Sequence, residues 1–128
     1  MSWVLESIEK YVKAVEHYEK NHSDELYAVK DNLDTYFTTL CLTNNPQLIH
    51  AGWIHYEPKG IVAIDQKGGG KKVREGKKIK LQETRLYVYP FQKTKTLYLL
   101  TIGDKRKHNQ KRDIQYCIEF VQALAAQN

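Results

Sequence analysis

The segment LYVYPFQKTKTLYLLTI, residues 86–102, carries the clearest structural signal in the chain. It contains two apolar runs rich in aromatic and β-branched residues, 86–89 and 97–102, and Pro90 and the stretch 93–96 separate them. Runs of this kind, bounded by turn residues, are typical of β-strands. The segment therefore predicts two neighbouring strands joined by a turn.

Two further strands are predicted upstream of this segment. Residues 61–64 form a short β-branched run, and residues 78–81 alternate lysine with isoleucine and leucine. Between residues 81 and 86 the apolar phase slips from odd to even positions. This slip fits either a tight turn near 82–84 or one long strand that carries Glu83 and Arg85 on the same face.

Helical periodicity occupies both ends of the chain. Apolar residues recur at helical spacing over 3–21, with Ser2 as the expected N-cap, over a second helix that begins at Ser23, and over 109–126. The short link between the first two helices makes them an antiparallel hairpin. We therefore predict one α+β domain, residues 1–128: a helical hairpin on a three- to four-stranded antiparallel sheet, followed by a C-terminal helix. The second face of the sheet is expected to be open to solvent or a ligand.

Composition narrows the class of protein. The longest apolar runs have four residues, too few for a membrane span, so we expect a cytoplasmic protein. Cys41 and Cys117 are far apart in sequence and are interpreted as core residues rather than as a disulfide or metal ligands. The chain lacks the glycine-rich motifs that bind nucleotides, and we expect neither a metal nor a cofactor.

Charge is segregated along the chain. Residues 1–58 hold four basic and nine acidic residues, whereas residues 59–128 hold sixteen basic and six acidic residues. A concentrated basic surface favours a polyanion partner. The predicted nucleic-acid-binding residues are those of the glycine-lysine segment 67–78 and of the region after the last strand: Lys71, Lys72, Arg74, Lys77, Lys78, Lys105 and Lys107. We expect these cations to converge in a concave pocket on the uncovered side of the sheet.

The runs 78–81, 85–89 and 97–106, followed by a terminal helix, resemble the RelE/ParE-like toxins of type II toxin-antitoxin systems. The resemblance implies a small basic bacterial protein that enters the ribosome and cuts messenger RNA, by attack of a ribose 2′-hydroxyl on the neighbouring phosphate without metal. It also implies an acidic antitoxin partner. The ParE-like alternative is a non-enzymatic inhibitor of DNA gyrase, and a third reading is a basic RNA-binding module without catalysis.

The same resemblance assigns candidate catalytic residues. Lys78 and Lys80 match the paired strand lysines, Arg85 matches the strand arginine, and Lys105 or Arg106 matches the cation after the last strand. The tyrosine that RelE proteins carry early in the last helix is absent, so Glu83 or His108 would have to transfer protons. The predicted catalytic set is therefore Arg85, Lys80, Glu83, Arg106 and His108.

Each of these features also has a purely structural interpretation. Glu83 and Arg85 would form a same-face ion pair worth under about 1 kcal/mol. Tyr87, Tyr89 and Tyr98 either stack on bases or pack within the sheet. His50 and His55 are expected to be structural histidines.

Overall fold

The computed structural model describes residues 2–66, 71–74 and 77–127, with 71–74 and 77–80 described as backbone only. The elements follow the order β1 (Val4–Ser7), α1 (Glu9–Asn21), α2 (Ser23–Thr43), η1 (Pro46–Leu48), β2 (Ile54–Tyr56), η2 (Pro58–Gly60), β3 (Val62–Asp65), β4 (Lys71–Arg74), β5 (Lys77–Lys80), β6 (Thr84–Phe91), β7 (Thr96–Asp104) and α3 (Lys107–Gln127). The elements η1 and η2 are short 3₁₀-helices.

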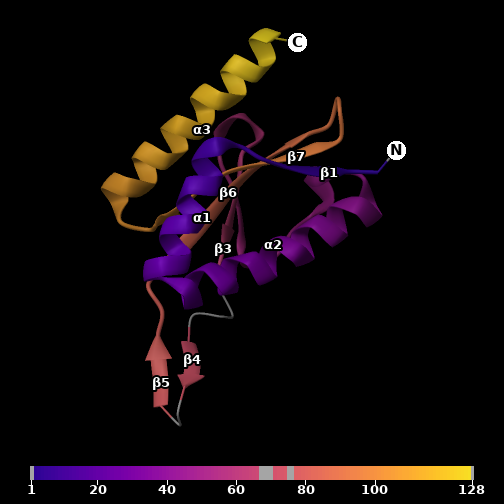
Figure 1. Ribbon diagram of the computed structural model, residues 1–128. Helices are drawn as coiled ribbons and strands as arrows, with labels where there is room; N and C mark the ends of the chain where they lie inside the picture. The colour runs from indigo at the N-terminus through magenta and orange to yellow at the C-terminus, as the bar shows by residue number, and fades with distance from the viewer. Residues whose placement is uncertain (1, 67–70, 75–76, 128) are drawn as a thin grey trace.

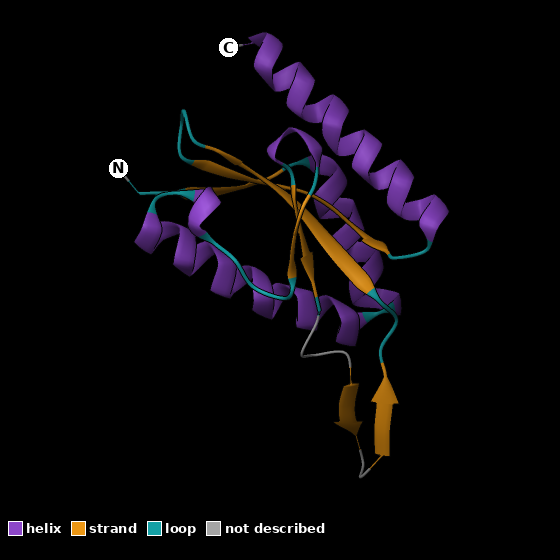
Figure 2. Ribbon diagram, turned by 180° about the vertical axis from the view of Figure 1, so that it is seen from behind, coloured by secondary structure: helices purple, strands orange, loops and turns teal. Residues whose placement is uncertain are grey.

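The main sheet has five strands in the order β1-β7-β6-β3-β2, and β4 and β5 form a separate two-stranded sheet. All neighbours in the main sheet are antiparallel except β1 and β7, which are parallel. The β4–β5 hairpin projects from one end of the main sheet (Figures 1 and 2). The α+β class is confirmed, but the expected antiparallel sheet of three or four strands was wrong, since the sheet is wider and mixed.

The first predicted helix was wrong at its N-terminal end. Val4–Ser7 is a strand that pairs with 96–99 of β7, and the helix begins at Glu9, so Ser2 does not cap it. The Ile8 N–H donates to the Leu99 carbonyl, 3.2 Å away, which continues the pairing up to the helix. Trp3 is buried and donates its indole N–H to Asn44 Oδ1 at 2.9 Å. Tertiary pairing therefore overrides a local helical pattern.

The β6–β7 pairing contains a bulge that distributes apolar residues to both sides of the sheet. Tyr87 pairs with Thr101 and Val88 with Leu99, so Leu100 is the extra residue. Leu99 consequently belongs to the core beneath α1 and α2, and Leu100 to the core beneath α3.

Helices cover both faces of the main sheet. The helical hairpin of α1 and α2 covers one face, as predicted, and α3 crosses the other (Figures 1 and 2). Ile61, Tyr87 and Leu100 on the second face are fully buried with Cys117 of α3. The expectation of an uncovered second face was wrong, because the apolar stripe of α3 is buried against that face.

The phase slip between residues 81 and 86 corresponds to a break, not to one long strand. Strand β5 ends at Lys80 and β6 begins at Thr84, and the Gln82 N–H donates to the Glu25 carboxylate at 2.9 Å. Of the two cysteines, Cys117 lies in the core as expected, whereas Cys41 is exposed, and both are free thiols. In the described part of the chain, no helix combines the length and the apolar character that crossing a membrane requires.

Candidate nucleic-acid interface

One end of the main sheet gathers most of the predicted functional positions. At this end strand β3 ends, β6 begins and β7 ends. Arg85 of β6 pairs with Asp65 of β3 on one side and with Gly103 of β7 on the other. The β4–β5 hairpin leaves and returns at this end, and α3 begins three residues after β7. The strand order thus brings the end of β3, the start of β6, the end of β7 and the start of α3 to one region.

Arg85, the predicted strand cation of the catalytic set, is buried at this end. Its residue is 8% exposed, and Nη1 lies 3.5 Å from Glu57 Oε1. Its Nε has no hydrogen-bond partner among the described residues. Glu83, the predicted same-face partner of Arg85, instead lies near Lys105 in the loop before β6. The structure therefore places Arg85 in a buried pair rather than on an accessible surface.

Asp65 organises a second polar group beside this pair. Its Oδ2 lies 3.3 Å from His55 Nε2 and 3.2 Å from Lys105 Nζ. Lys105 also lies 3.8 Å from Glu83 Oε1. Because the expected nucleic-acid-binding residue Lys105 faces two carboxylates, its charge is largely balanced. His55, which was expected to be a structural histidine, pairs with this buried carboxylate.

Arg106 forms an ion pair within the turn that leads into α3. It forms two contacts with the Asp104 carboxylate, Nε to Oδ1 at 3.2 Å and Nη2 to Oδ2 at 2.8 Å, and Asn109 donates to the same carboxylate. Hydrogen bonds from Arg106 are the main reason that the pKa of Asp104 falls to about 2. The same carboxylate raises the pKa of Arg106. Asp104 was missed by sequence reasoning, although an aspartate just before a helix is a common turn-forming residue.

A cavity of about 610 Å³ joins some of the predicted catalytic residues. It brings Glu83, Lys105 and Arg106 together with His22 and Asp104. Arg85 and His108 are not among its lining residues; His108 is exposed in the first turn of α3. The structure therefore gathers part of the predicted set and adds His22, which had no sequence signal beyond its position between two helices.

A second cavity, of about 390 Å³, lies along the first half of α3 and carries more accessible cations. It is lined by Lys105, Lys107 and Lys111, with Gln110, Ile114 and Gln115. Lys107 and Lys111 are exposed, and neither takes part in an ion pair with another described residue. The first turn of α3 has no acidic residue. Cations near a helix N-terminus oppose the helix dipole by about 0.3–1 kcal/mol each, so these lysines do not serve helix stability.

The remaining predicted nucleic-acid-binding residues belong to the hairpin. Lys71, Lys72 and Arg74 lie on β4, and Lys77, Lys78 and the predicted catalytic Lys80 lie on β5, but their side chains lie outside the described part of the structure. The predicted single pocket on an uncovered face was wrong, because α3 occupies that face. Of the cations predicted to be functional whose side chains the structure describes, Arg85, Lys105 and Arg106 lie around the sheet end, and Lys107 lies on α3.

An unpredicted buried acid lies on the face of α3 that packs against the main sheet. Asp113 is 5% exposed, and its Oδ2 has no hydrogen-bond partner among the described residues. A Cβ atom at Gly103 would collide with this carboxylate, so glycine is what allows the close approach. Burial is the main cause that raises the pKa of Asp113 to about 6, against the opposing attraction of Arg112 and Lys10. An acid at a core position of an amphipathic helix was the only available sequence signal.

The described residues contain no group of three His, Cys, Asp or Glu side chains that could hold a metal ion together. No protein-family model, no curated protein and no solved structure matches the chain. The case for function therefore depends on the charges, cavities and contacts described above.

Proposed function

We propose that the protein binds RNA through a cationic surface along the first half of α3, continued by the basic β4–β5 hairpin. The observation that carries the proposal is the pair Lys107 and Lys111, exposed and without ion-pair partners among the described residues, beside a cavity at the positive end of a helix. Backbone N–H groups at a helix N-terminus and nearby lysines both favour phosphate groups.

The position of the hairpin supports the same proposal. Six of the ten residues 71–80 are basic, and the only acidic residue among them is Glu75. The hairpin leaves the main sheet at the end where α3 begins. A polyanion bound along α3 would therefore meet a second basic segment at the same end of the molecule.

Binding is tested with a labelled, short single-stranded RNA by fluorescence anisotropy. The double variant Lys107→Glu, Lys111→Glu should weaken binding by about ten-fold or more at moderate salt, because two phosphate contacts are lost and repulsion replaces them. The matched control, Lys20→Glu with Lys30→Glu, changes the net charge equally on the helical hairpin and should have a much smaller effect. Equal losses in both double variants would contradict a localised interface.

A second candidate function, RNA cleavage by a toxin of the RelE type, is favoured by the cavity that holds His22, Glu83 and Lys105. Glu83 is well exposed, with 69% of its side chain accessible, and could accept the proton of a ribose 2′-hydroxyl. The 2′-oxygen would then form a bond to phosphorus as the bond to the 5′-oxygen breaks, with Lys105 near the developing negative charge and His22 donating a proton to the leaving oxygen.

The products distinguish cleavage from binding alone. Cleavage of this kind leaves a 2′,3′-cyclic phosphate, which mass spectrometry detects, and induction of the chain in a bacterium should arrest growth with new messenger 5′ ends. Glu83→Gln should abolish both effects while RNA binding persists. If RNA stays intact in the presence of the parent protein, cleavage is contradicted and RNA binding alone remains as the proposed function.

A further inference from the structure

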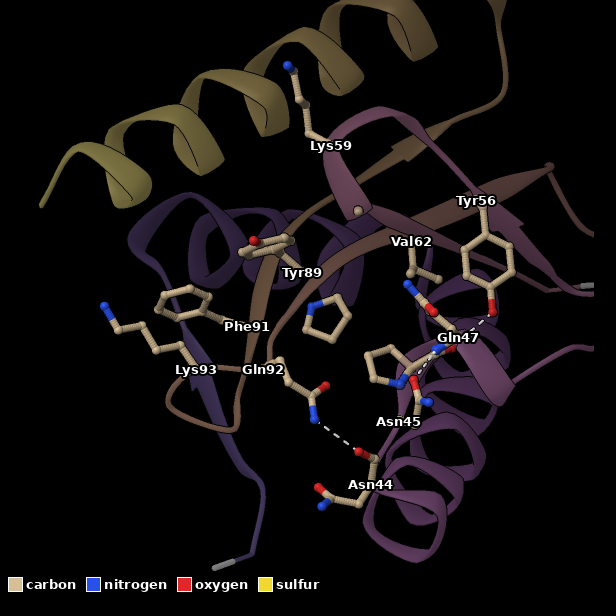
Figure 3. Close-up of a pocket in the computed structure, with 13 residues that line it drawn as sticks. Asn44, Asn45, Gln47, Tyr56, Lys59, Val62, Tyr89, Phe91, Gln92 and Lys93 are labelled. Atoms are coloured by element: carbon tan, nitrogen blue, oxygen red, sulfur yellow. Dashed lines mark hydrogen bonds between the residues drawn. The ribbon is translucent and has the colours of Figure 1, made fainter. Parts of the chain in front are cut away.

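A third cavity, of about 670 Å³, is lined by the residues drawn in Figure 3. Its lining includes the end of β6 and the turn after it, at the end of the main sheet opposite to the β4–β5 hairpin. Its walls come from the segment after α2, from η2 and from the end of β6 with the turn that follows. Of the residues that the sequence singled out for function, it is lined by Tyr89, one of the three tyrosines considered for stacking on bases, and by none of the predicted catalytic or nucleic-acid-binding residues. The lining combines aromatic rings, proline rings, amide side chains and lysines.

Aromatic and proline rings form the apolar part of this cavity. The rings of Tyr89 and Phe91 are nearly parallel, with centroids 6.0 Å apart and an angle of 23° between planes. The Tyr56 hydroxyl donates to the carbonyl of Pro46 at 3.1 Å, and also contacts the Ile49 carbonyl. The 46–49 segment, one wall of the cavity, is therefore fixed to β2. A preformed site of this kind needs little ordering when a ligand binds.

The amide groups of the cavity are only partly used by the fold. Gln92 donates through Nε2 to the Asn44 carbonyl at 3.0 Å, and the Asn45 side-chain oxygen accepts the Gln47 N–H at 3.0 Å (Figure 3). These bonds leave the Gln92 carbonyl oxygen as an acceptor and the Asn45 amide nitrogen as a donor. A donor and an acceptor beside aromatic rings match the edge and the face of a nucleobase.

The charge of the lining favours an anionic ligand. The lining contains two lysines, Lys59 and Lys93, and no acidic residue. Their side chains point away from the cavity centre (Figure 3). Among the described residues, three non-glycine residues have positive φ angles, and two of them line this cavity: Asn44 at 54° and Lys59 at 65°. Asn44 is the C-cap of α2, where a left-handed asparagine is a common way to end a helix, and Lys59 lies within η2.

We propose that this cavity binds an unpaired base of single-stranded RNA, stacked against the Tyr89 and Phe91 rings. The Gln92 and Asn45 amides would contact the base edge, and the rim lysines would lie toward the phosphates on either side. This inference rests on the proposed RNA binding, and it adds a base-binding site at the opposite end of the sheet from the hairpin. The absence of acidic residues from the described lining favours a polyanion over a neutral proline-rich peptide, the other ligand that aromatic grooves accept.

The test compares RNA that has bases with an abasic oligonucleotide of the same length and charge, using the full chain. Phe91→Leu should lower affinity for the base-containing RNA by about ten-fold, the usual effect of losing one stacking contact, and leave abasic binding unchanged. Tyr27→Leu, which removes an exposed aromatic ring from α2, is the matched control and should change neither affinity. Loss of the same size on both oligonucleotides, or no loss, would overturn the proposal.

Two further measurements keep the result decisive. Gln92→Leu, at an exposed position, removes the side-chain oxygen that would accept a hydrogen bond from the base edge. It should lower affinity for base-containing RNA and leave abasic binding unchanged, and it decides the question if Phe91→Leu does not fold. RNA containing 4-thiouridine should cross-link to the peptide that holds Tyr89 and Phe91. Cross-links found only within 105–115 would overturn the base site, and so would a cavity that binds a proline-rich peptide but no RNA. Unchanged RNA binding by the Lys107, Lys111 double variant would instead refute the proposed α3 interface alone.

Discussion

Replacing Asp113 by asparagine should remove a pH-dependent loss of stability. The Asp113 carboxyl is buried beneath α3 against Gly103, and its pKa is raised from 3.8 to about 6. Between these two values the folded protein holds a proton that the unfolded chain releases, so the free energy of unfolding falls as pH rises. A shift of about two units corresponds to about 3 kcal/mol lost by pH 7. Asparagine resembles the protonated acid but cannot ionise, so the variant should not lose this stability as pH rises.

Urea unfolding of both proteins over a series of pH values measures this effect. The stability of Asp113→Asn relative to the parent should increase by about 2.4 kcal/mol between pH 4 and pH 7, since part of the effect is already present at pH 4. Contributions from other carboxyls, including Asp104, cancel in the comparison. Glu119→Gln, which changes an exposed acid on the same helix, should show no such increase. A difference that stays constant across this pH range would refute the argument that Asp113 is forced to ionise in a buried site.

Three other predictions follow from contacts described above. Arg85→Ala should destabilise the fold by about 2 kcal/mol in chemical denaturation, because it leaves the half-buried Glu57 carboxylate without its partner, and the double variant with Glu57→Ala should cost less than the sum of the single variants. Gly103→Ala should lower the melting temperature, by an amount equivalent to about 1–3 kcal/mol, since its methyl group would displace the Asp113 carboxylate and shift α3. Gly60→Ala is the comparison: its methyl group meets only an ordinary contact with a side chain, although alanine would have to adopt a left-handed conformation, and the variant should lose less stability. In RNA binding, the slope of log affinity against log salt should become less steep by about 0.7 for each of Lys107 and Lys111 that is removed, and an unchanged slope would mean that they do not contact phosphates.

The regular elements with strong local patterns could be predicted from the sequence. The strands around 86–89 and 97–102, the second helix and the terminal helix follow from apolar spacing and turn residues. Strand β1 could not be predicted, because residues 4–7 fit a helical stripe equally well and become a strand only through pairing with β7, more than ninety positions away. The position of α3 likewise depends on a match between its stripe and the second face of the sheet.

Only the positive charge of the candidate site could be predicted from the sequence. The excess of lysine and arginine after residue 58 is visible in the sequence, and it predicts a polyanion partner whatever the fold. Which cations remain accessible depends on packing: Arg85 is paired with Glu57, 28 positions away, and Arg106 with Asp104, whereas Lys107 and Lys111 remain exposed. The cavity beside Tyr89 and Phe91 joins segments between residues 44 and 93, and no local pattern in the sequence signals it.

The parallel pairing of β1 with β7 constrains when the chain can fold during synthesis. Thr96, the partner of Val4, is synthesised 92 residues after it. Until then Val4 and Leu5 of the nascent chain have no native partner, and afterwards they remain about half exposed, at 56% and 47%. The sheet can therefore be completed only after β7 has been synthesised, and a chaperone that holds residues 4–7 until then should raise the yield of native protein.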